Sequence, residues 1–274
     1  MASIGIFDSG YGGLTVFKSI AARMPEYNYI YLGDNARAPY GNRSFETVYE
    51  YTLECVEWLF AAGCELVILA CNTASAKALR TIQQHDLPRL GAHKRVLGVI
   101  RPTAEVVGQY SRSKHIGILG TMGTVQSESY LIEIKNFAPD MEVTQHACPL
   151  WVPLVEANAY QTEAAQLIIR SDVSQLLEQD EQIDAILLAC THYPILTPIL
   201  QQFVPDSVSI ISQGELVADS LADYLQRHPE METRMDKKGA ELFFTTGDAG
   251  DFEAHASLFF GKEIKAGTCN VVKK

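Results

Sequence analysis

Short apolar runs alternate along this chain with longer stretches in which apolar residues recur every three or four positions. Runs of four or five apolar residues are typical of strands buried on both faces, and the recurring pattern is typical of helices packed on them. The alternation predicts an α/β fold with mostly parallel sheets, in which ligands bind beyond the carboxyl ends of the strands. The predicted strands are residues 4–7, 29–32, 66–70, 96–100, 116–119, 185–189 and 208–211, and the predicted helices are residues 45–61, 74–84, 103–109, 127–136, 163–179 and 214–226.

Two segments of the chain have counterparts further along it. Residues 4–10 (IGIFDSG) resemble residues 116–122 (IGILGTM), 112 residues later, and Cys71 in LACNT resembles Cys190 in LLACTH, 119 residues later. Two matches in the same order and at similar spacing predict two related, doubly wound α/β halves. Each half then places one cysteine just beyond a strand. If the halves face each other, the two thiols lie on opposite sides of one cleft.

Composition and charge narrow the class of protein. The 274 residues are 47% hydrophobic and 20% charged, which allows two packed domains, and the net charge of -11 disfavours nucleic acid as a partner. The first residues enter a strand-like run with no basic segment, and no apolar stretch approaches the length of a membrane span, so we expect neither a signal peptide nor membrane insertion. The six cysteines show no metal-binding spacing. We expect free thiols, no metal site and a cytoplasmic location.

The two matched cysteines are the candidates for chemistry. Cys71 precedes a predicted helix, where free N–H groups favour a thiolate and could also hold a carboxylate. Alone, Cys71 is more consistent with a small buried apolar residue than with a reactive thiol. Cys190 is followed by Thr191 and His192, and a histidine there can tune the thiol or relay a proton to it. A Cys–His pair suits a thiol hydrolase, but that chemistry needs one cysteine and this chain has two in matched settings.

A glycine-rich turn, residues 8–13 (DSGYGG), follows the first strand and permits close approach of the backbone to a ligand. A dinucleotide site is an alternative, because the turn begins like the nucleotide-binding fingerprint and Asp34 ends the next strand. Two features count against it: Thr15 occupies the third glycine position, and Asp8 would place a negative charge beside a pyrophosphate. Downstream, Pro39 and Gly41 restrict a loop that contains Tyr40, and Glu156 taken alone is an ordinary solvated residue.

Taken together, these segments resemble the glutamate racemase family within the aspartate/glutamate racemase superfamily. No single motif is specific, but the ordered set covers most of the chain. The resemblance implies an active site between two α/β domains, the first formed by residues 1–98 plus 212–274 and the second by residues 99–211. The motifs that carry it are FDSGYGG (7–13), PYG (39–41), CNTAS (71–75), VIRPT (99–103), PLVE (153–156), CTHYP (190–194) and QGE (213–215).

The resemblance also implies roles for the site residues. Cys71 would serve the D-enantiomer and Cys190 the L-enantiomer, with Asp8 and His192 assisting the neighbouring thiols and Glu156 supporting His192. The internal repeat independently pairs Thr121 with Ser9. The substrate would be held by Asp8, Ser9, Pro39, Tyr40, Gly41, Asn72, Thr73, Thr121, Thr191 and His192.

The activity implied is interconversion of L- and D-glutamate without a cofactor, supplying D-glutamate for peptidoglycan synthesis. One base on one face would return the α-proton with retention, whereas a thiolate and a thiol on opposite faces exchange roles with substrate handedness. The sequence has no lysine-centred pyridoxal phosphate motif. We expect a homodimer, as is usual for the family, and no activation by a cell-wall precursor, because no long extension precedes Asp8.

Three alternatives stay open at this point. A related racemase acting on aspartate would share most of the motifs. A non-catalytic protein that binds acidic amino acids would share the fold, although binding alone needs no thiols. A nicotinamide-dependent oxidoreductase would require the dinucleotide interpretation of the glycine-rich turn.

Overall fold

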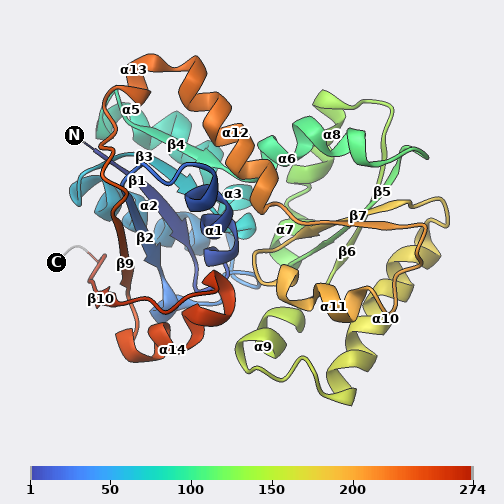
Figure 1. Cartoon of the computed structure of the whole chain (residues 1–274). Helices are drawn as coiled ribbons and strands as arrows, with labels where there is room; N and C mark the ends of the chain where they lie inside the picture. The colour runs from blue at the N-terminus through green and yellow to red at the C-terminus, as the bar shows by residue number, and fades with distance from the viewer. Residues whose placement is uncertain (1, 273–274) are drawn as a thin grey trace.

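A computed structural model describes residues 2–272, which contain two parallel sheets lying side by side (Figure 1). The first has six strands in the order β10-β9-β2-β1-β3-β4, and the second has four in the order β6-β5-β7-β8. Every strand pair within them is parallel. The strands are β1 (Ser3–Asp8), β2 (Tyr29–Gly33), β3 (Cys64–Leu69), β4 (Arg95–Gly98), β5 (His115–Gly120), β6 (Glu142–Ala147), β7 (Ala185–Ala189), β8 (Ser209–Ile211), β9 (Glu241–Thr245) and β10 (Ala266–Thr268).

The two sheets repeat one arrangement of strands. The order β2-β1-β3-β4 in the first sheet corresponds to β6-β5-β7-β8 in the second, so β1 and β5 occupy equivalent places, as do β3 and β7. The registers correspond as well, because Gly5 pairs with Val67 and Gly117 pairs with Ile186. The two segments that repeat in the sequence are therefore the central strand pairs of the two sheets, and the predicted fold class is confirmed.

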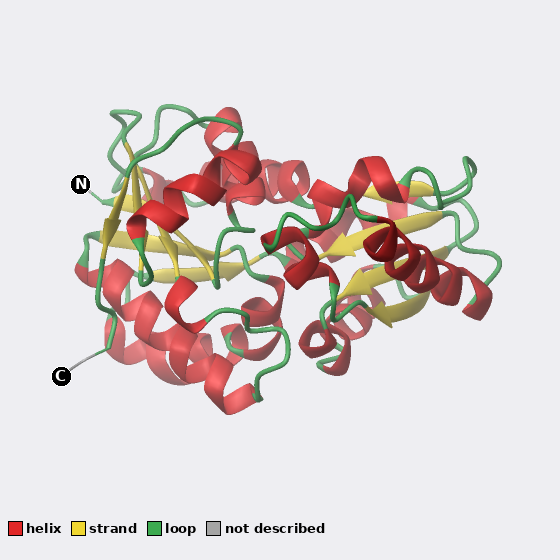
Figure 2. Cartoon of the chain, turned by 90° about the horizontal axis from the view of Figure 1, so that it is seen from below, coloured by secondary structure: helices red, strands yellow, loops and turns green. Residues whose placement is uncertain are grey.

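Helices cover both faces of each sheet, as Figure 2 shows from below. Helices α1, α12 and α14 lie over one face of the six-stranded sheet and α2 over the other, while α10 and the pair α6 and α8 cover opposite faces of the four-stranded sheet. The helices are α1 (Leu14–Arg23), α2 (Phe45–Ala61), α3 (Asn72–Lys77), α4 (Leu79–Thr81), α5 (Leu87–Leu90), α6 (Ile100–Val106), α7 (Met122–Gln126), α8 (Ser129–Phe137), α9 (Trp151–Glu156), α10 (Glu163–Gln179), α11 (Thr197–Leu200), α12 (Gly214–Arg227), α13 (Pro229–Glu232) and α14 (Ala249–Phe260).

Two of the predicted elements were wrong in their extent. The strand predicted at 96–100 ends at Gly98, because Val99 turns into the helical region and α6 begins at Ile100. The helix predicted at 74–84 is broken at Ala78 into α3 and α4, and a π-helical turn follows at Ile82–Asp86. These breaks place the end of β4 and the start of α6 against α3, where Ser75 Oγ accepts a hydrogen bond from the Val99 N–H at 3.3 Å.

Helices α2 and α10 begin and end at the predicted residues. Each begins beside a side-chain oxygen that accepts from a free N–H: Ser44 Oγ lies 3.1 Å from Thr47 N, and Thr162 Oγ1 lies 3.3 Å from Ala165 N.

All six cysteines are free thiols, as expected. Within residues 2–272, no helix combines the length and apolar character needed to cross a membrane.

Candidate active site

The carboxyl ends of β3 and β7 bring the two matched cysteines to one narrow cavity. Cys71 caps α3, with its Sγ accepting from Ala74 N at 3.4 Å, and Cys190 directly follows β7. The cavity has a volume of about 20 Å³, room for about one water molecule. It is lined by Ser9, Ala38, Pro39, Tyr40, Gly41, Cys71, Asn72, Thr73, Thr121, Val152, Glu156, Cys190, Thr191 and His192. Of the site residues predicted from the sequence, only Asp8 is absent from the lining.

Asp8 lies directly behind this lining, at the end of β1, and is fully buried. Its carboxylate accepts a hydrogen bond from the N–H of Gly10 at 2.9 Å and another from the hydroxyl of Thr191 at 3.4 Å. Ser9 comes next in the chain, and its Oγ lies 3.5 Å from Cys71 Sγ. Asp8 therefore connects the glycine-rich turn to the segment that carries Cys190.

His192 and Glu156 form a pair on the side of the four-stranded sheet. His192 Nε2 lies 3.0 Å from Glu156 Oε1, and the ring is buried with its edge against Phe259. The Glu156 side chain is 26% exposed at the end of α9, so it meets solvent while it orients the imidazole. The family resemblance implied this pairing, whereas Glu156 taken alone was interpreted as an ordinary surface residue.

Burial dominates the protonation of the two thiols. Burial, together with the nearby Asp8 carboxylate, raises the pKa of Cys71 to about 11. Burial likewise raises the pKa of Cys190 well above its usual value, although a hydrogen bond from the His192 backbone opposes the shift. The N–H of Ala74 at the start of α3 lowers the pKa of Cys71, in the direction expected for a helix N-terminus, but desolvation is the larger effect. A ligand that carries positive charge would offset this cost.

The loop after β2 is fixed by Asp34, which is fully buried. Its carboxylate accepts from Arg37 Nε at 2.7 Å, from Thr246 Oγ1 at 2.7 Å and from the Tyr40 hydroxyl. Both carboxylate oxygens of Asp34 thus already have protein partners, so neither is available to bind the ribose of a dinucleotide. The loop instead places Tyr40 and Gly41 in the cavity.

Hydroxyl groups and one backbone contact join the two halves across the cavity. Thr73 Oγ1, at the start of α3, lies 2.9 Å from Thr121 Oγ1, which caps α7. The carbonyl oxygen of Gly41 accepts from Gly123 N at 2.8 Å. The repeat in the sequence had paired Thr121 with Ser9, and both residues line the cavity.

The family model described as Asp/Glu/hydantoin racemase matches residues 13–221 of this sequence. This chain belongs to that family. It is similar to a glutamate racemase of Roseobacter denitrificans, with 40% identity over 273 residues that cover 96% of this chain and 98% of that protein. Its structure is similar to that of a glutamate racemase from Bacillus anthracis, with a TM-score of 0.88, 33% identity, and 98% of this chain and 97% of that one covered.

A second solved structure is a glutamate racemase from Francisella tularensis in complex with D-glutamate. It matches with a TM-score of 0.86 and 27% identity, covering 98% of both chains. The resemblance inferred from the ordered motifs is therefore confirmed, and the racemase fold extends over nearly the whole chain.

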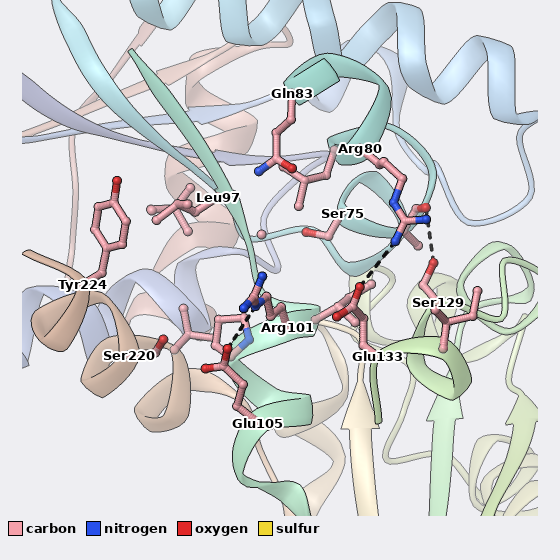
Figure 3. Close-up of a pocket in the computed structure, with 18 of the residues that line it drawn as sticks. Ser75, Arg80, Gln83, Leu97, Arg101, Glu105, Ser129, Glu133, Ser220 and Tyr224 are labelled. Atoms are coloured by element: carbon pink, nitrogen blue, oxygen red, sulfur yellow. Dashed lines mark hydrogen bonds and ion pairs between the residues drawn. The ribbon is translucent and has the colours of Figure 1, made fainter. Parts of the chain in front are cut away.

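A larger cavity of about 700 Å³ is lined by the later residues of α3, Ser75 to Lys77, and by neighbouring elements (Figure 3). Its walls include α3, α4, β4, α6, α8 and α12, and they carry the ion pairs Arg80–Glu133 at 3.6 Å and Arg101–Glu105 at 3.0 Å. No cysteine and none of the predicted site residues belong to its lining. The residues predicted from the sequence therefore gather at the smaller cavity and not at this one.

The fold also gathers His146, Cys148 and Asp172, whose potential ligand atoms lie within 4.8 Å of one another. Sequence spacing gave no sign of this group, because Asp172 comes from α10. The Asp172 carboxylate is already occupied by His146 Nε2 at 3.0 Å and Trp151 Nε1 at 2.6 Å. Protein partners thus satisfy this carboxylate, and we assign the group to structural support behind Tyr193, whose hydroxyl donates to the carbonyl of Cys148 at 3.0 Å.

Proposed function

We propose that this chain interconverts L- and D-glutamate without a cofactor, using Cys71 and Cys190 as a paired acid and base. The observation that carries the proposal is that the matched cysteines of two related halves line one narrow cavity. The glutamate racemases of Roseobacter denitrificans and Bacillus anthracis support the choice of substrate.

Racemisation requires removal of a weakly acidic α-proton from one face and delivery of a proton to the other. A thiolate on one side and a thiol on the other satisfy this requirement in both directions, because they exchange roles when the handedness of the substrate changes. In the proposed assignment, Cys190 removes the proton of L-glutamate and Cys71 that of D-glutamate. The carbanion is stabilised by fixed N–H and O–H donors in a cavity that excludes bulk water.

The polar residues around the thiols receive supporting roles in this proposal. Asp8 assists Cys71, and His192, oriented by Glu156 at 3.0 Å, assists Cys190. Burial and nearby negative charge together raise the pKa of both thiols, and the ammonium group of the substrate offsets both effects. The remaining lining groups, contributed by Ser9, Pro39, Tyr40, Gly41, Asn72, Thr73, Thr121 and Thr191, hold the carboxylates and the ammonium group.

The size of the cavity suggests how substrate enters. A cavity of about 20 Å³ does not hold a molecule as large as glutamate, so binding requires the cleft to widen. We propose that residues 1–98 plus 212–274 move as one domain and residues 99–211 as another. We further propose a homodimer in the cytoplasm whose product serves peptidoglycan synthesis.

A substrate panel tests the proposed function. Purified protein, dialysed against chelator and given no coenzyme, should abolish the circular dichroism of L-glutamate and of D-glutamate, and L-aspartate should turn over much more slowly. Turnover of aspartate in preference to glutamate would support the alternative of a related racemase. Binding of glutamate without loss of optical activity would support the non-catalytic alternative.

The protonation of the thiols predicts the pH dependence of the reaction. A thiol whose pKa is about 11 is protonated at neutral pH, whereas the proposed mechanism needs one thiolate. The reactive fraction of free enzyme therefore increases as pH rises, and kcat/KM should increase between about pH 6 and about pH 9. Because bound substrate brings an ammonium group, kcat should rise less steeply than kcat/KM. A kcat/KM that is flat or falls over this range would contradict the proposed protonation state.

A further inference from the structure

A closed group of buried hydrogen bonds lies behind Asn72. Asn72 Nδ2 donates to Gln213 Oε1 at 2.7 Å, and Asn72 Oδ1 accepts from the Tyr130 hydroxyl at 2.6 Å. Gln213 Nε2 donates to the same Tyr130 oxygen at 2.6 Å and to Thr103 Oγ1 at 2.8 Å. All four side chains are at most 3% exposed. Each broken bond in this group would leave a polar atom without water to replace its partner.

The direction of every bond in the group can be assigned. Thr103 donates its own hydrogen to the carbonyl of Val99 at 2.8 Å, so it accepts from Gln213. Gln213 Nε2 therefore uses its two hydrogens on Thr103 and Tyr130, which leaves Oε1 to accept from Asn72. Tyr130 then uses its single hydrogen on Asn72 Oδ1. Thr103 therefore fixes which end of the Gln213 amide faces it. Gln213 in turn fixes the orientation of Asn72 and Tyr130, because the two ends of its amide have opposite polarity and a tyrosine hydroxyl can either donate or accept.

This orientation matters because Asn72 lines the catalytic cavity. One hydrogen of its Nδ2 is used on Gln213, and the other is the one available to a ligand. If the amide were turned over, Oδ1 would face Gln213 Oε1, and an acceptor would face a substrate carboxylate in place of a donor. The buried group therefore fixes which end of Asn72 a substrate meets.

The four residues come from different parts of the fold. Asn72 begins α3, Thr103 lies in α6, Tyr130 lies in α8, and Gln213 precedes α12. In Figure 1, α3, α6 and α12 converge between the two sheets. The chain enters the four-stranded sheet through Val99 and leaves it through Gln213, and Gln213 Nε2 also lies 3.4 Å from the Val99 carbonyl. The group therefore joins Asn72 to both connections between the sheets.

We propose that Gln213 is a positioning residue for this reaction, acting through Asn72 to hold an N–H group toward the substrate carboxylate. The inference rests on the proposed glutamate racemase function. It adds a residue that touches neither the substrate nor a cysteine.

The test compares variants that break different bonds of the group. Gln213→Met replaces the side-chain amide, with its oxygen and its nitrogen, by an apolar side chain of similar volume. The Asn72 amide and the Tyr130 hydroxyl are then free to reorient. We expect KM for both enantiomers to rise and kcat/KM to fall about tenfold. Because the enantiomers have equal free energy, kcat/KM must fall by the same factor for L- and D-glutamate, which provides an internal check on the data.

Thr103→Val is the matched control, because it removes a buried hydrogen-bonding group of the same cluster and leaves both bonds to Asn72 in place. The Val99 carbonyl, 3.4 Å from Gln213 Nε2, still favours the same orientation of the Gln213 amide in this variant. It should lower the melting temperature while KM stays at the wild-type value. Tyr130→Phe provides a second variant should Gln213→Met fail to fold, and its KM should rise in the same direction. The double variant Gln213→Met/Tyr130→Phe should have a KM no higher than that of Gln213→Met alone, because both changes act through Asn72.

A wild-type KM in folded Gln213→Met would overturn the inference, as would a KM for Thr103→Val raised as much as that of Gln213→Met. A wild-type KM in Tyr130→Phe would overturn it where Gln213→Met does not fold. These results are distinct from a failure of the proposed function, in which the wild-type protein itself would not racemise glutamate.

Discussion

Cys71→Ser and Cys190→Ser are each expected to lose about a thousandfold or more in the rate of glutamate racemisation. A serine hydroxyl is a far weaker acid than a thiol, so its anion is scarcely populated even where the thiolate is accessible. Each variant therefore lacks a competent acid or base on one face of the substrate. Circular dichroism of either enantiomer measures the loss directly.

The two variants should differ toward an analogue with a leaving group on the β-carbon. Elimination from such an analogue needs removal of one α-proton and no return of a proton. Cys71→Ser, with Cys190 intact, should process the L-analogue, and Cys190→Ser, with Cys71 intact, should process the D-analogue. Reversed handedness would exchange the assignment of the faces, whereas equal processing of both analogues by both variants would contradict the two-base mechanism.

Cys148→Ser is the matched control for these substitutions. Cys148 is as deeply buried as the other two cysteines and also follows a strand of the four-stranded sheet, but it does not line the cavity. Its replacement should lower stability, because a hydroxyl is poorly solvated there, while racemisation per folded molecule stays within a few fold of the wild-type rate.

Gly12→Ala is expected to lower kcat/KM by about a hundredfold. A Cβ at this position would fall far inside van der Waals contact of His192 Nδ1 and Thr191 Oγ1, so both side chains would have to move. That movement would pull His192 from Glu156 and Thr191 from Asp8, and it would displace the segment that carries Cys190. Steady-state kinetics with both enantiomers measures the effect.

Gly10→Ala is the control for this substitution in the same turn. Its added Cβ would meet its nearest neighbour, Asn35 Nδ2, at 3.6 Å, which is ordinary contact. The control should retain activity within a few fold of wild type. Equal losses in the two variants would show that the turn tolerates no side chain at all, and the explanation through His192 would be wrong.

The central strands could be predicted from the sequence because β1, β3, β5 and β7 are covered on both faces, so each contains a run of at least four residues without a polar side chain. The edge strand β6 was missed, because its residues (EVTQHA) are partly exposed and carry polar side chains. β9 and β10 were missed as well; β9 combines an apolar run with an exposed residue, and β10 has three residues.

The site could be predicted to the extent that its residues occur in short motifs. Cys71, Asn72 and Thr73 are adjacent in the chain, as are Cys190, Thr191 and His192, so each motif carries its own geometry. Two properties needed the folded structure. Burial raises the pKa of Cys71, and Asn72 bonds to Gln213. Both depend on segments distant in sequence that come together only when the two sheets lie side by side.

The most direct test of the central claim is the position of deuterium early in the reaction of L-glutamate in deuterated water. Two thiols on opposite faces predict that the D-glutamate formed first carries deuterium at the α-carbon, while the remaining L-glutamate still carries protium. The labels are read by mass spectrometry after the enantiomers are separated. D-glutamate that retains protium, or deuterium that appears equally in both enantiomers from the first time points, would contradict the account.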